Sequence, residues 1–493
     1  MDEFIRYVLP LYDVVAFNLF GTFLLRPVFS PADLFTVIGG QAFSDARTKA
    51  EHAVHADART LYTLGDIYRH MPAEMQDMQQ VELAEEGRRT VVNPPILEAY
   101  RKARALGKKI VFMADTYLPE AEVRKLLAAK GITEYDGLYV SCDRGCSKYD
   151  GALFRKMAND QHVAPQTVVY VGSSKRDLSG GTRVGVYTRY VPEITDTLFD
   201  ENTHLAAFFR ENHGADNPTM RRFFGALALA YHLNKCAHGD DPWCRTGCTL
   251  TAPMYYSYMR WVLEQAKTLN KKKLLLCLRD CHIIGKMLDR VAPDVDYQYL
   301  ATPRAAVKPV LEDGLNSPKG KACAKYINAN ITSPADSLIV EGTSSRGSVE
   351  CAINCILGRR IPAVYFSRSL DPETCEKASY IKNSRYEHRY TFIETTGSAP
   401  LLPYRGFSED GTPVHKEPIT YDKYRNYGVQ RREQAAVETA ALLFANDTYL
   451  TGEECERFIE CCFAHTDPKD TTFFLNQLTC WDTDHNAWCA IWG

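Results

Sequence analysis

The sequence predicts an α/β protein with two parallel sheets in separate domains, a helical cap in the first domain and further helices at the C-terminal end. Three observations carry this prediction. Short apolar runs, such as residues 14–17 and 274–278, alternate with segments of helical spacing. The 493 residues exceed what a single hydrophobic core usually supports. A composition of 45% apolar and 24% charged residues is ordinary for a globular protein.

The first predicted strand has a polar residue at its end. Residues 14–17 (VVAF) form a buried apolar run, Asn18 follows, and Gly21 and Thr22 mark a tight turn. Polar groups in this position are well placed for catalysis, but an amide cannot act as a carboxylate nucleophile. The fold of this segment is therefore easier to predict than its chemistry.

Three further segments have a similar layout of an apolar strand followed by small, polar or charged residues. They are GKKIVFMADTYLP (107–119), YVSCDRGCSKYDGALF (139–154) and TVVYVGSSKRDLSGG (167–181). In a parallel sheet the carboxyl ends of the strands meet at one edge, where ligands bind. The residues of interest in these segments are Ala114, Asp115, Lys148, Ser173 and Asp177.

Together the four segments resemble the motifs of the haloacid dehalogenase-like (HAD) superfamily, and most of all the large two-domain HAD-like proteins of bacterial surface-polysaccharide biosynthesis loci. The resemblance implies a HAD-like Rossmannoid domain over residues 1–195, with a helical cap at about 30–95. In the family an aspartate nucleophile ends the first strand and a serine after the second binds the phosphoryl oxygen. A lysine balances the charge, and acids of the fourth motif help to hold Mg²⁺.

Three of these positions differ in this chain. Asn18 stands at the nucleophile position, Ala114 at the serine position and Ser173 at a metal-site carboxylate, whereas Lys148 and Asp177 match the family. The resemblance therefore implies a phosphohydrolase site that has become inactive. Of the acids that hold Mg²⁺ in the family, Asp177 is the one that this chain retains.

Two alternatives to this interpretation stay open. In the first, the chain is an active hydrolase of a phosphorylated small molecule, in which Thr22, Asp115, Lys148 and Asp177 support direct attack by water. In the second, Lys148 is a semi-exposed lysine in an inherited loop and Asp177 caps the helix that follows Ser174.

A second α/β domain is expected over residues 251–400, after a helical connector at 196–250. Polar residues follow its predicted strands at 274–278, 297–300 and 337–340, and a Gly/Ser-rich turn at 341–348 precedes a helix. Such a turn can surround an anion with hydroxyls and N–H groups, and arginines add fork-shaped donors. We therefore expect a phosphorylated or anionic small molecule here, such as a sugar phosphate or nucleotide sugar. The binding residues would be Arg279, Arg304, Thr343, Ser344, Ser345 and Arg346.

Asp280 is the acid among these candidates and would be the catalytic base. The polysaccharide-locus proteins carry an arginine-aspartate-glycine after a comparable strand, and here Cys281 replaces the glycine. The alternative is that Arg279 and Asp280 form a local ion pair and that the Ser/Gly turn only caps a helix.

The region 401–493 is expected to be largely helical, with amphipathic segments near 429–450 and 452–466. Its last residues are rich in tryptophan. Trp481, Trp488 and Trp492 would either pack on the second domain or bind a protein partner. The chain could then be a non-catalytic scaffold or regulatory partner, which is a third functional hypothesis.

Charge, hydropathy and cysteine spacing argue against nucleic-acid binding, a membrane span and a structural zinc site. A formal net charge of −3 gives no electrostatic case for nucleic-acid binding, and no apolar run approaches the roughly 18 residues of a transmembrane helix. With no export signal recognised we expect a cytoplasmic protein with free cysteines. The spacing of Cys236, His238, Cys244 and Cys248 matches no structural zinc pattern.

Overall fold

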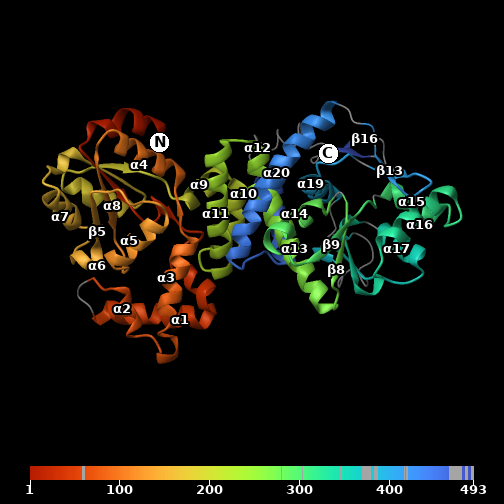
Figure 1. The fold of residues 1–493 in the computed structure, drawn as a ribbon, viewed down its shortest axis with the longest axis horizontal. Coiled ribbons are helices and arrows are strands. Elements are labelled where there is room, and N and C mark those ends of the chain that lie inside the picture. The colour runs from red at the N-terminus through yellow and green to blue at the C-terminus, as the bar shows by residue number, and fades with distance from the viewer. Residues whose placement is uncertain are drawn as a thin grey trace. The chain divides into compact units, whose positions relative to one another are not determined.

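The computed structural model of the protein describes residues 1–57, 61–278, 280–302, 304–344, 347–368, 379–381, 387–402, 404–415, 417, 420–465, 480–482 and 487–489. The chain divides into two compact units, which are coloured along the chain in Figure 1. Unit 1 comprises Met1–Leu198 and Met220–Cys236, and unit 2 comprises Phe199–Thr219 and Ala237–Gly493. Each contains a five-stranded parallel sheet, so the predicted α/β fold class is confirmed.

The sheet of unit 1 has the order β5-β4-β1-β6-β7. Its three central strands are almost wholly buried, as expected for parallel strands covered on both faces. The strand order reverses between β1 and β6, and this is where open α/β sheets bind their ligands. The strands are β1 (Val14–Asn18), β4 (Lys109–Ala114), β5 (Gly137–Val140), β6 (Val168–Gly172) and β7 (Tyr187–Tyr190).

Helices connect these strands, and three short turns of other helix types complete the unit. The connecting helices are α4 (Pro94–Ala105), α5 (Glu120–Ala129), α6 (Ser141–Arg144), α7 (Ala152–Asp160) and α8 (Lys175–Arg183). The short turns are η1 (Phe4–Val8), η2 (Leu9–Leu11) and η4 (Pro165–Thr167). Helix α9 (Ile194–Glu201) leads out of the unit, and most of α11 (Pro218–His238) returns to it.

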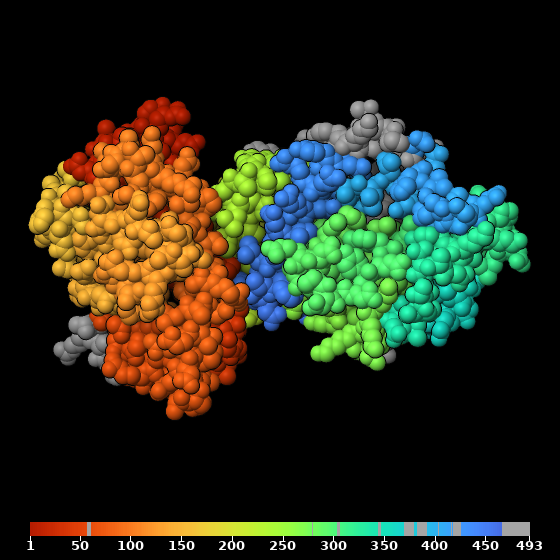
Figure 2. All heavy atoms as spheres, viewed as in Figure 1, coloured from red at the N-terminus to blue at the C-terminus, as the bar shows by residue number. Residues whose placement is uncertain are grey.

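The cap is inserted between β1 and α4 and forms a lobe of unit 1 (Figure 2). The chain enters and leaves it through an antiparallel ribbon of β2 (Leu24–Leu25) and β3 (Val91–Val92). Its helices are α1 (Asp33–Asp57), α2 (Leu64–Tyr68), η3 (Ala73–Met75) and α3 (Met78–Arg89). A Thr63–Asp66 capping box begins α2.

A buried arginine stabilises the interior of the cap. Arg47 of α1 is fully buried and donates to both carboxylate oxygens of Glu82, at 2.9 and 3.0 Å, and to Glu51 at 2.8 Å. Its guanidinium carbon also lies 4.9 Å from the ring centre of Tyr117, in the loop after β4. This arginine therefore joins two cap helices to a loop at the carboxyl edge of the sheet.

The sheet of unit 2 has the order β12-β11-β10-β8-β9. Numbered along the chain from β8, this is the arrangement 5-4-3-1-2, and its order reverses between β8 and β10. The strands are β8 (Lys273–Cys277), β9 (Asp296–Leu300), β10 (Ser337–Ser344), β11 (Ala363–Arg368) and β12 (Ser379–Ile381).

Helices and two small antiparallel ribbons complete unit 2. The helical elements are α10 (Thr203–Glu211), α12 (Pro242–Thr246), η5 (Gly247–Thr251), α13 (Ala252–Thr268), α14 (His282–Val291), α15 (Arg304–Glu312), α16 (Pro318–Asn330), η6 (Pro334–Asp336), α17 (Ser348–Leu357), α19 (Glu387–Gly397), α20 (Thr420–Ala445) and α21 (Gly452–His465). The ribbons pair β13 (Tyr404–Phe407) with β14 (Pro413–His415), and β15 (Cys480–Asp482) with β16 (Ala487–Cys489). In the part of the chain that the structure describes, no helix combines the length and apolarity needed to cross a bilayer.

Candidate functional site

The motif segments of unit 1 meet at the carboxyl edge of its sheet. Asn18 ends β1 beside Met113 of β4, and Asp115 follows that strand. Lys148 lies in the loop before α7, and Ser173 follows β6. The structure brings together all the candidate residues predicted for this unit, namely Asn18, Thr22, Asp115, Lys148 and Asp177.

Lys148 is the centre of this group and is 2% exposed, so the alternative of a semi-exposed loop lysine is wrong. Its Nζ donates to Asn18 Oδ1 at 2.5 Å and lies 2.6 Å from Asp177 Oδ2. It also donates to the hydroxyl of Tyr170 at 3.2 Å. A lysine ammonium has three N–H donors, so three protein oxygens satisfy all of them.

The contacts of Asn18 fix the orientation of its amide. Because its Oδ1 accepts from Lys148, its Nδ2 points the other way and donates to Phe20 O at 2.7 Å and to Thr22 Oγ1 at 3.2 Å. Thr22 Oγ1 also accepts from the backbone N–H of Ser173 at 3.1 Å and contacts its hydroxyl at 3.3 Å. The end of β1 is thereby tied to the end of β6.

Asp115 and Tyr170 have environments that disfavour their charged forms. Burial raises the pKa of Asp115, and the neighbouring Asp177 adds to this, whereas Lys148 acts in the opposite direction. The Asp115 carboxylate accepts the backbone N–H of Lys148 at 3.1 and 3.2 Å, so it also holds the lysine loop. Burial raises the pKa of Tyr170 well above its ordinary value, so its phenol stays protonated.

A glycine allows the helix that carries Asp177 to approach the lysine loop. A Cβ atom at Gly180 of α8 would lie 2.0 Å from the backbone oxygen of Lys148 and 2.8 Å from that of Tyr149. Only glycine fits between these backbones. Ser174 is the N-cap of this helix and its hydroxyl accepts the N–H of Asp177 in the first turn, so the helix is capped by Ser174 and the alternative that Asp177 caps it is wrong.

The side-chain oxygens at this edge that could hold a Mg²⁺ ion are engaged by Lys148: Asp177 and Asn18 contact its ammonium, and Asp115 accepts its backbone N–H. Mg²⁺ requires oxygen ligands in octahedral geometry, commonly with one or two carboxylates. Here Asp177 is paired with Lys148, Asn18 presents its oxygen to the same ammonium, and a serine hydroxyl stands at the second carboxylate position. Within the described ranges no group of three His, Cys, Asp or Glu residues is arranged to hold a metal ion.

Several residues predicted for the second site lie outside the described part of the chain. These are Arg279, Ser345 and Arg346, together with the side chains of Arg304 in α15 and Ser344 in β10. Thr343 is described, and its hydroxyl contacts Glu394 of α19. Asp280 follows β8 and lies against Gly342 of β10. Of the three C-terminal tryptophans, Trp481 and Trp488 are register partners in the β15–β16 ribbon, and Trp492 lies outside the described residues.

Sequence analysis placed Glu341 in the Gly/Ser-rich turn at 341–348 without naming it as a site residue, whereas the structure extends β10 through it to Ser344. This residue follows four strand residues in β10, is 5% exposed, and its Oε1 has no hydrogen-bond partner among the described residues. Burial, with help from Glu350 and Asp280, raises its pKa to about 8. An acid at the end of an apolar strand (SLIVEG, 337–342) was a signal that could have identified it.

A histidine–glutamate pair at the start of α14 was also missed. The Nδ1 atom of His282 lies 2.8 Å from the carboxylate of Glu433 in α20, and the imidazole stacks on Tyr299 at 5.4 Å between ring centres. The two paired residues are 151 positions apart, so no local pattern could have joined them.

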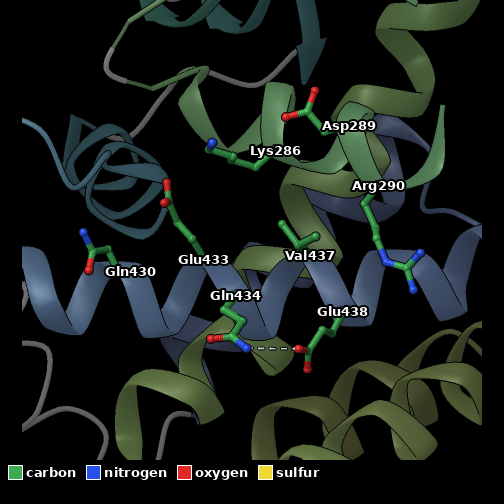
Figure 3. Close-up of a pocket in the computed structure, with 8 residues that line it drawn as sticks. All are labelled: Lys286, Asp289, Arg290, Gln430, Glu433, Gln434, Val437 and Glu438. Atoms are coloured by element: carbon green, nitrogen blue, oxygen red, sulfur yellow. Dashed lines mark hydrogen bonds between the residues drawn. The ribbon is translucent and has the colours of Figure 1, made fainter. Parts of the chain in front are cut away.

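A pocket of about 470 Å³ lies between α14 and α20 (Figure 3). Glu433, the partner of His282, is part of its lining, and Gln434 donates to Glu438 within it at 3.2 Å. Acidic and basic side chains both line the pocket, so it presents no electrostatic field of a single sign to a ligand. The lining residues are Lys286, Asp289, Arg290, Gln430, Glu433, Gln434, Val437 and Glu438.

The sequence matches no protein-family model and no curated protein. It is similar to solved structures at low identity, each aligned over 37% of this chain. One is a HAD family enzyme from Bacteroides thetaiotaomicron in a magnesium complex, with 12% identity, 94% of that chain covered and a TM-score of 0.31. Another is a predicted phosphoglycolate phosphatase from Haemophilus somnus, with 16% identity, 89% covered and a TM-score of 0.27. A third is a haloacid dehalogenase-like family hydrolase from Xanthomonas campestris, with 14% identity, 82% covered and a TM-score of 0.30.

These similarities concern the fold alone. The strand order of unit 1 and the cap inserted after β1 agree with the motif order from which the HAD-like resemblance was inferred. At these identities and TM-scores the solved structures carry no argument, so the HAD-like resemblance of unit 1 rests on its four motif segments and their order along the chain.

Proposed function

We propose that unit 1 is a HAD-like unit that has lost phosphohydrolase activity, and that the chain acts in cytoplasmic surface-glycan or sugar-phosphate metabolism through a ligand site in unit 2. One observation supports the loss of phosphohydrolase activity in unit 1. The Lys148 ammonium is satisfied by Asn18, Tyr170 and Asp177, with no carboxylate at the nucleophile position. A phosphoryl group would have to break these contacts to reach the lysine.

The chemistry of the three altered positions supports this proposal. A covalent phosphoenzyme needs an anionic oxygen nucleophile, and the oxygen of Asn18 belongs to a neutral amide already engaged by Lys148. Ala114 supplies no hydroxyl for a phosphoryl oxygen, and Ser173 supplies no carboxylate for a metal ion. Unit 1 would then act as a scaffold or as a sensor.

The second part of the proposal depends on unit 2. Its sheet has its own reversal point between β8 and β10, where small molecules bind in open α/β sheets. The arginines and hydroxyls predicted near this point suit a phosphorylated ligand. The glycan role itself comes from the resemblance to the polysaccharide-locus proteins.

A phosphatase screen tests the loss of activity. The whole chain would be assayed against a broad panel of phosphate esters with and without Mg²⁺, beside Asn18→Asp and the triple variant Asn18→Asp/Ala114→Ser/Ser173→Asp. We expect no turnover by the native chain or by the single variant, because each still lacks a hydroxyl at position 114 and a carboxylate at position 173.

A Lys148→Ala variant is the control for that screen. Mg²⁺-dependent turnover by the native chain that disappears in Lys148→Ala would favour the active-hydrolase alternative. Robust turnover by Asn18→Asp alone would also contradict the proposal, since it would mean that one amide is all that separates the site from activity.

A further inference from the structure

The pocket between α14 and α20 is lined by basic side chains from one helix and acidic side chains from the other. Lys286 and Arg290 project from α14, whereas Glu433 and Glu438 belong to α20 (Figure 3). Its volume of about 470 Å³ is within the range of small-molecule sites. Both helices belong to unit 2, so the pocket lies within one unit.

The two cations of the α14 wall have no carboxylate partner. Lys286 and Arg290 are exposed and lie one turn apart on the same face of the helix, where like charges repel. Neither forms an ion pair among the residues that the structure describes. Asp289, the acid beside them on α14, accepts the Tyr297 hydroxyl at 2.7 Å. An anionic group bound between the two cations would relieve their repulsion.

The acids of the α20 wall are not neutralised by the α14 wall. Glu433 is buried and lies 2.8 Å from Nδ1 of His282, which is outside the pocket lining. Glu438 is exposed, and its carboxylate accepts from the neutral amide of Gln434 at 3.2 Å. Within the described ranges no ion pair joins either acid to a cation across the pocket. Opposite charges therefore stay apart on the two walls, and a ligand that carries both could engage both.

The middle of the pocket is apolar. Val437 of α20 is partly buried and points toward α14, with Lys286 and Arg290 on either side of it in Figure 3. The methylene stems of these two side chains add apolar surface, while their charged ends stay in water. A ligand that fills the pocket therefore meets hydrocarbon at its centre and charge toward its ends.

We propose that this pocket binds a small zwitterion in which a short aliphatic chain separates a carboxylate from an ammonium group. The carboxylate contacts Lys286 and Arg290, and the ammonium contacts Glu438. The aliphatic chain lies on Val437. A purely anionic ligand would face the acids of the pocket, and a purely cationic ligand would face its bases. This inference is independent of the proposed function, because it concerns helix side chains rather than the strand ends of unit 2.

Saturation-transfer NMR on the whole chain tests the proposal with a series of zwitterions. The probes are glycine, β-alanine, 4-aminobutyrate, 5-aminopentanoate and 6-aminohexanoate, which differ in the length of the chain between the two charges. Butyrate and butylamine each keep only one charge. We expect saturation of at least one of the three longest zwitterions, and a signal fivefold or more weaker for glycine, butyrate and butylamine.

Charge reversal at the two walls tests which residues hold the ligand. The variants are Arg290→Glu, Glu438→Arg and the double variant that carries both reversals. Both positions are exposed, so the fold should be retained, and tryptophan fluorescence checks this because all five tryptophans lie in unit 2. Glu312→Arg on the exposed face of α15 is the matched control. Each single reversal should weaken the signal of the best probe fivefold or more. The double variant should recover at least threefold over either single variant, because the ligand can bind in the opposite direction.

Four results would overturn the inference: no saturation of any zwitterion, equal saturation of the best zwitterion and a single-charge analogue, an unchanged signal in either folded single variant, or no recovery in the double variant. A loss in Glu312→Arg equal to that in Glu438→Arg would also contradict it, since the effect would then not be specific to the pocket. The phosphatase screen concerns unit 1, so its outcome leaves this test unaffected.

Discussion

Replacement of Glu341 by glutamine should stabilise unit 2 at alkaline pH and have little effect in acid. Glu341 has a pKa of about 8 in the folded unit, against the usual 4.5 of a glutamate. Below pH 4.5 the carboxyl is protonated in both the folded and unfolded states, so ionisation adds nothing to the free energy of unfolding. Between pH 4.5 and 8 only the unfolded state ionises, and this lowers the stability of the native chain.

The size of this pH-dependent loss of stability follows from the difference between the folded and unfolded pKa values of Glu341. They differ by about 3.5 pH units, and at roughly 1.36 kcal/mol per unit the native chain loses about 5 kcal/mol of unfolding free energy by pH 8. Above pH 8 both states are ionised and the loss stays constant. Glutamine does not titrate, so Glu341→Gln should lack this pH dependence while keeping nearly the same shape.

Urea unfolding followed by tryptophan fluorescence would measure the difference in unfolding free energy between the native chain and Glu341→Gln. Because unit 1 contains no tryptophan, the signal reports unit 2 alone. Unfolding free energies of the native chain, Glu341→Gln and the exposed control Glu312→Gln would be compared at pH 4, 6 and 8.5. A native-to-variant difference that is the same at all three pH values would refute the assignment of a neutral buried acid.

Three further predictions concern unit 1. Lys148→Met should destabilise it by about 3 kcal/mol, the lower end of the range for a buried pair, since the Asp177 carboxylate that it leaves uncompensated is 13% exposed; circular dichroism during urea unfolding would detect this. Gly180→Ala should lower the melting temperature far more than Gly65→Ala. The Cβ added at position 180 would lie 2.0 Å from a backbone oxygen, whereas the Cβ added at position 65 would lie 3.7 Å from a side-chain atom. Equal melting temperatures of the two variants would contradict the structure. Arg47→Met should cost about 3–5 kcal/mol through the uncompensated Glu82 carboxylate, and faster limited proteolysis within residues 33–89 would be its sign.

Much of unit 1 could be predicted because its signals are local. The apolar runs of β1, β4 and β6 each identify a buried strand, and the residue after each run lies at the carboxyl edge. The grouping of Asn18, Asp115 and Lys148 followed from motif order. The role of Tyr170 could not be predicted, because a tyrosine within an apolar strand is indistinguishable from a core aromatic until its hydroxyl has a partner.

Contacts between distant segments were beyond sequence reasoning for a physical reason. Arg47 and Glu82 lie on different cap helices, and His282 and Glu433 are 151 residues apart. Both pairs depend on how helices pack, which a periodic pattern does not specify. The state of Glu341 was equally hidden, because burial and neighbouring acids, rather than residue type, set its pKa.

The division of the chain between the units constrains the order in which the protein can fold during synthesis. Unit 1 is complete only when Met220–Cys236 has been made, since this segment supplies the Arg221 contact to Asp33 at 2.7 Å and the His232 contact to Asn93 at 2.9 Å. The intervening helix α10 must in turn wait for α21, made about 250 residues later, to cover its apolar face. A nascent chain released early would therefore expose core surface of both units, and chaperone dependence is the expected consequence.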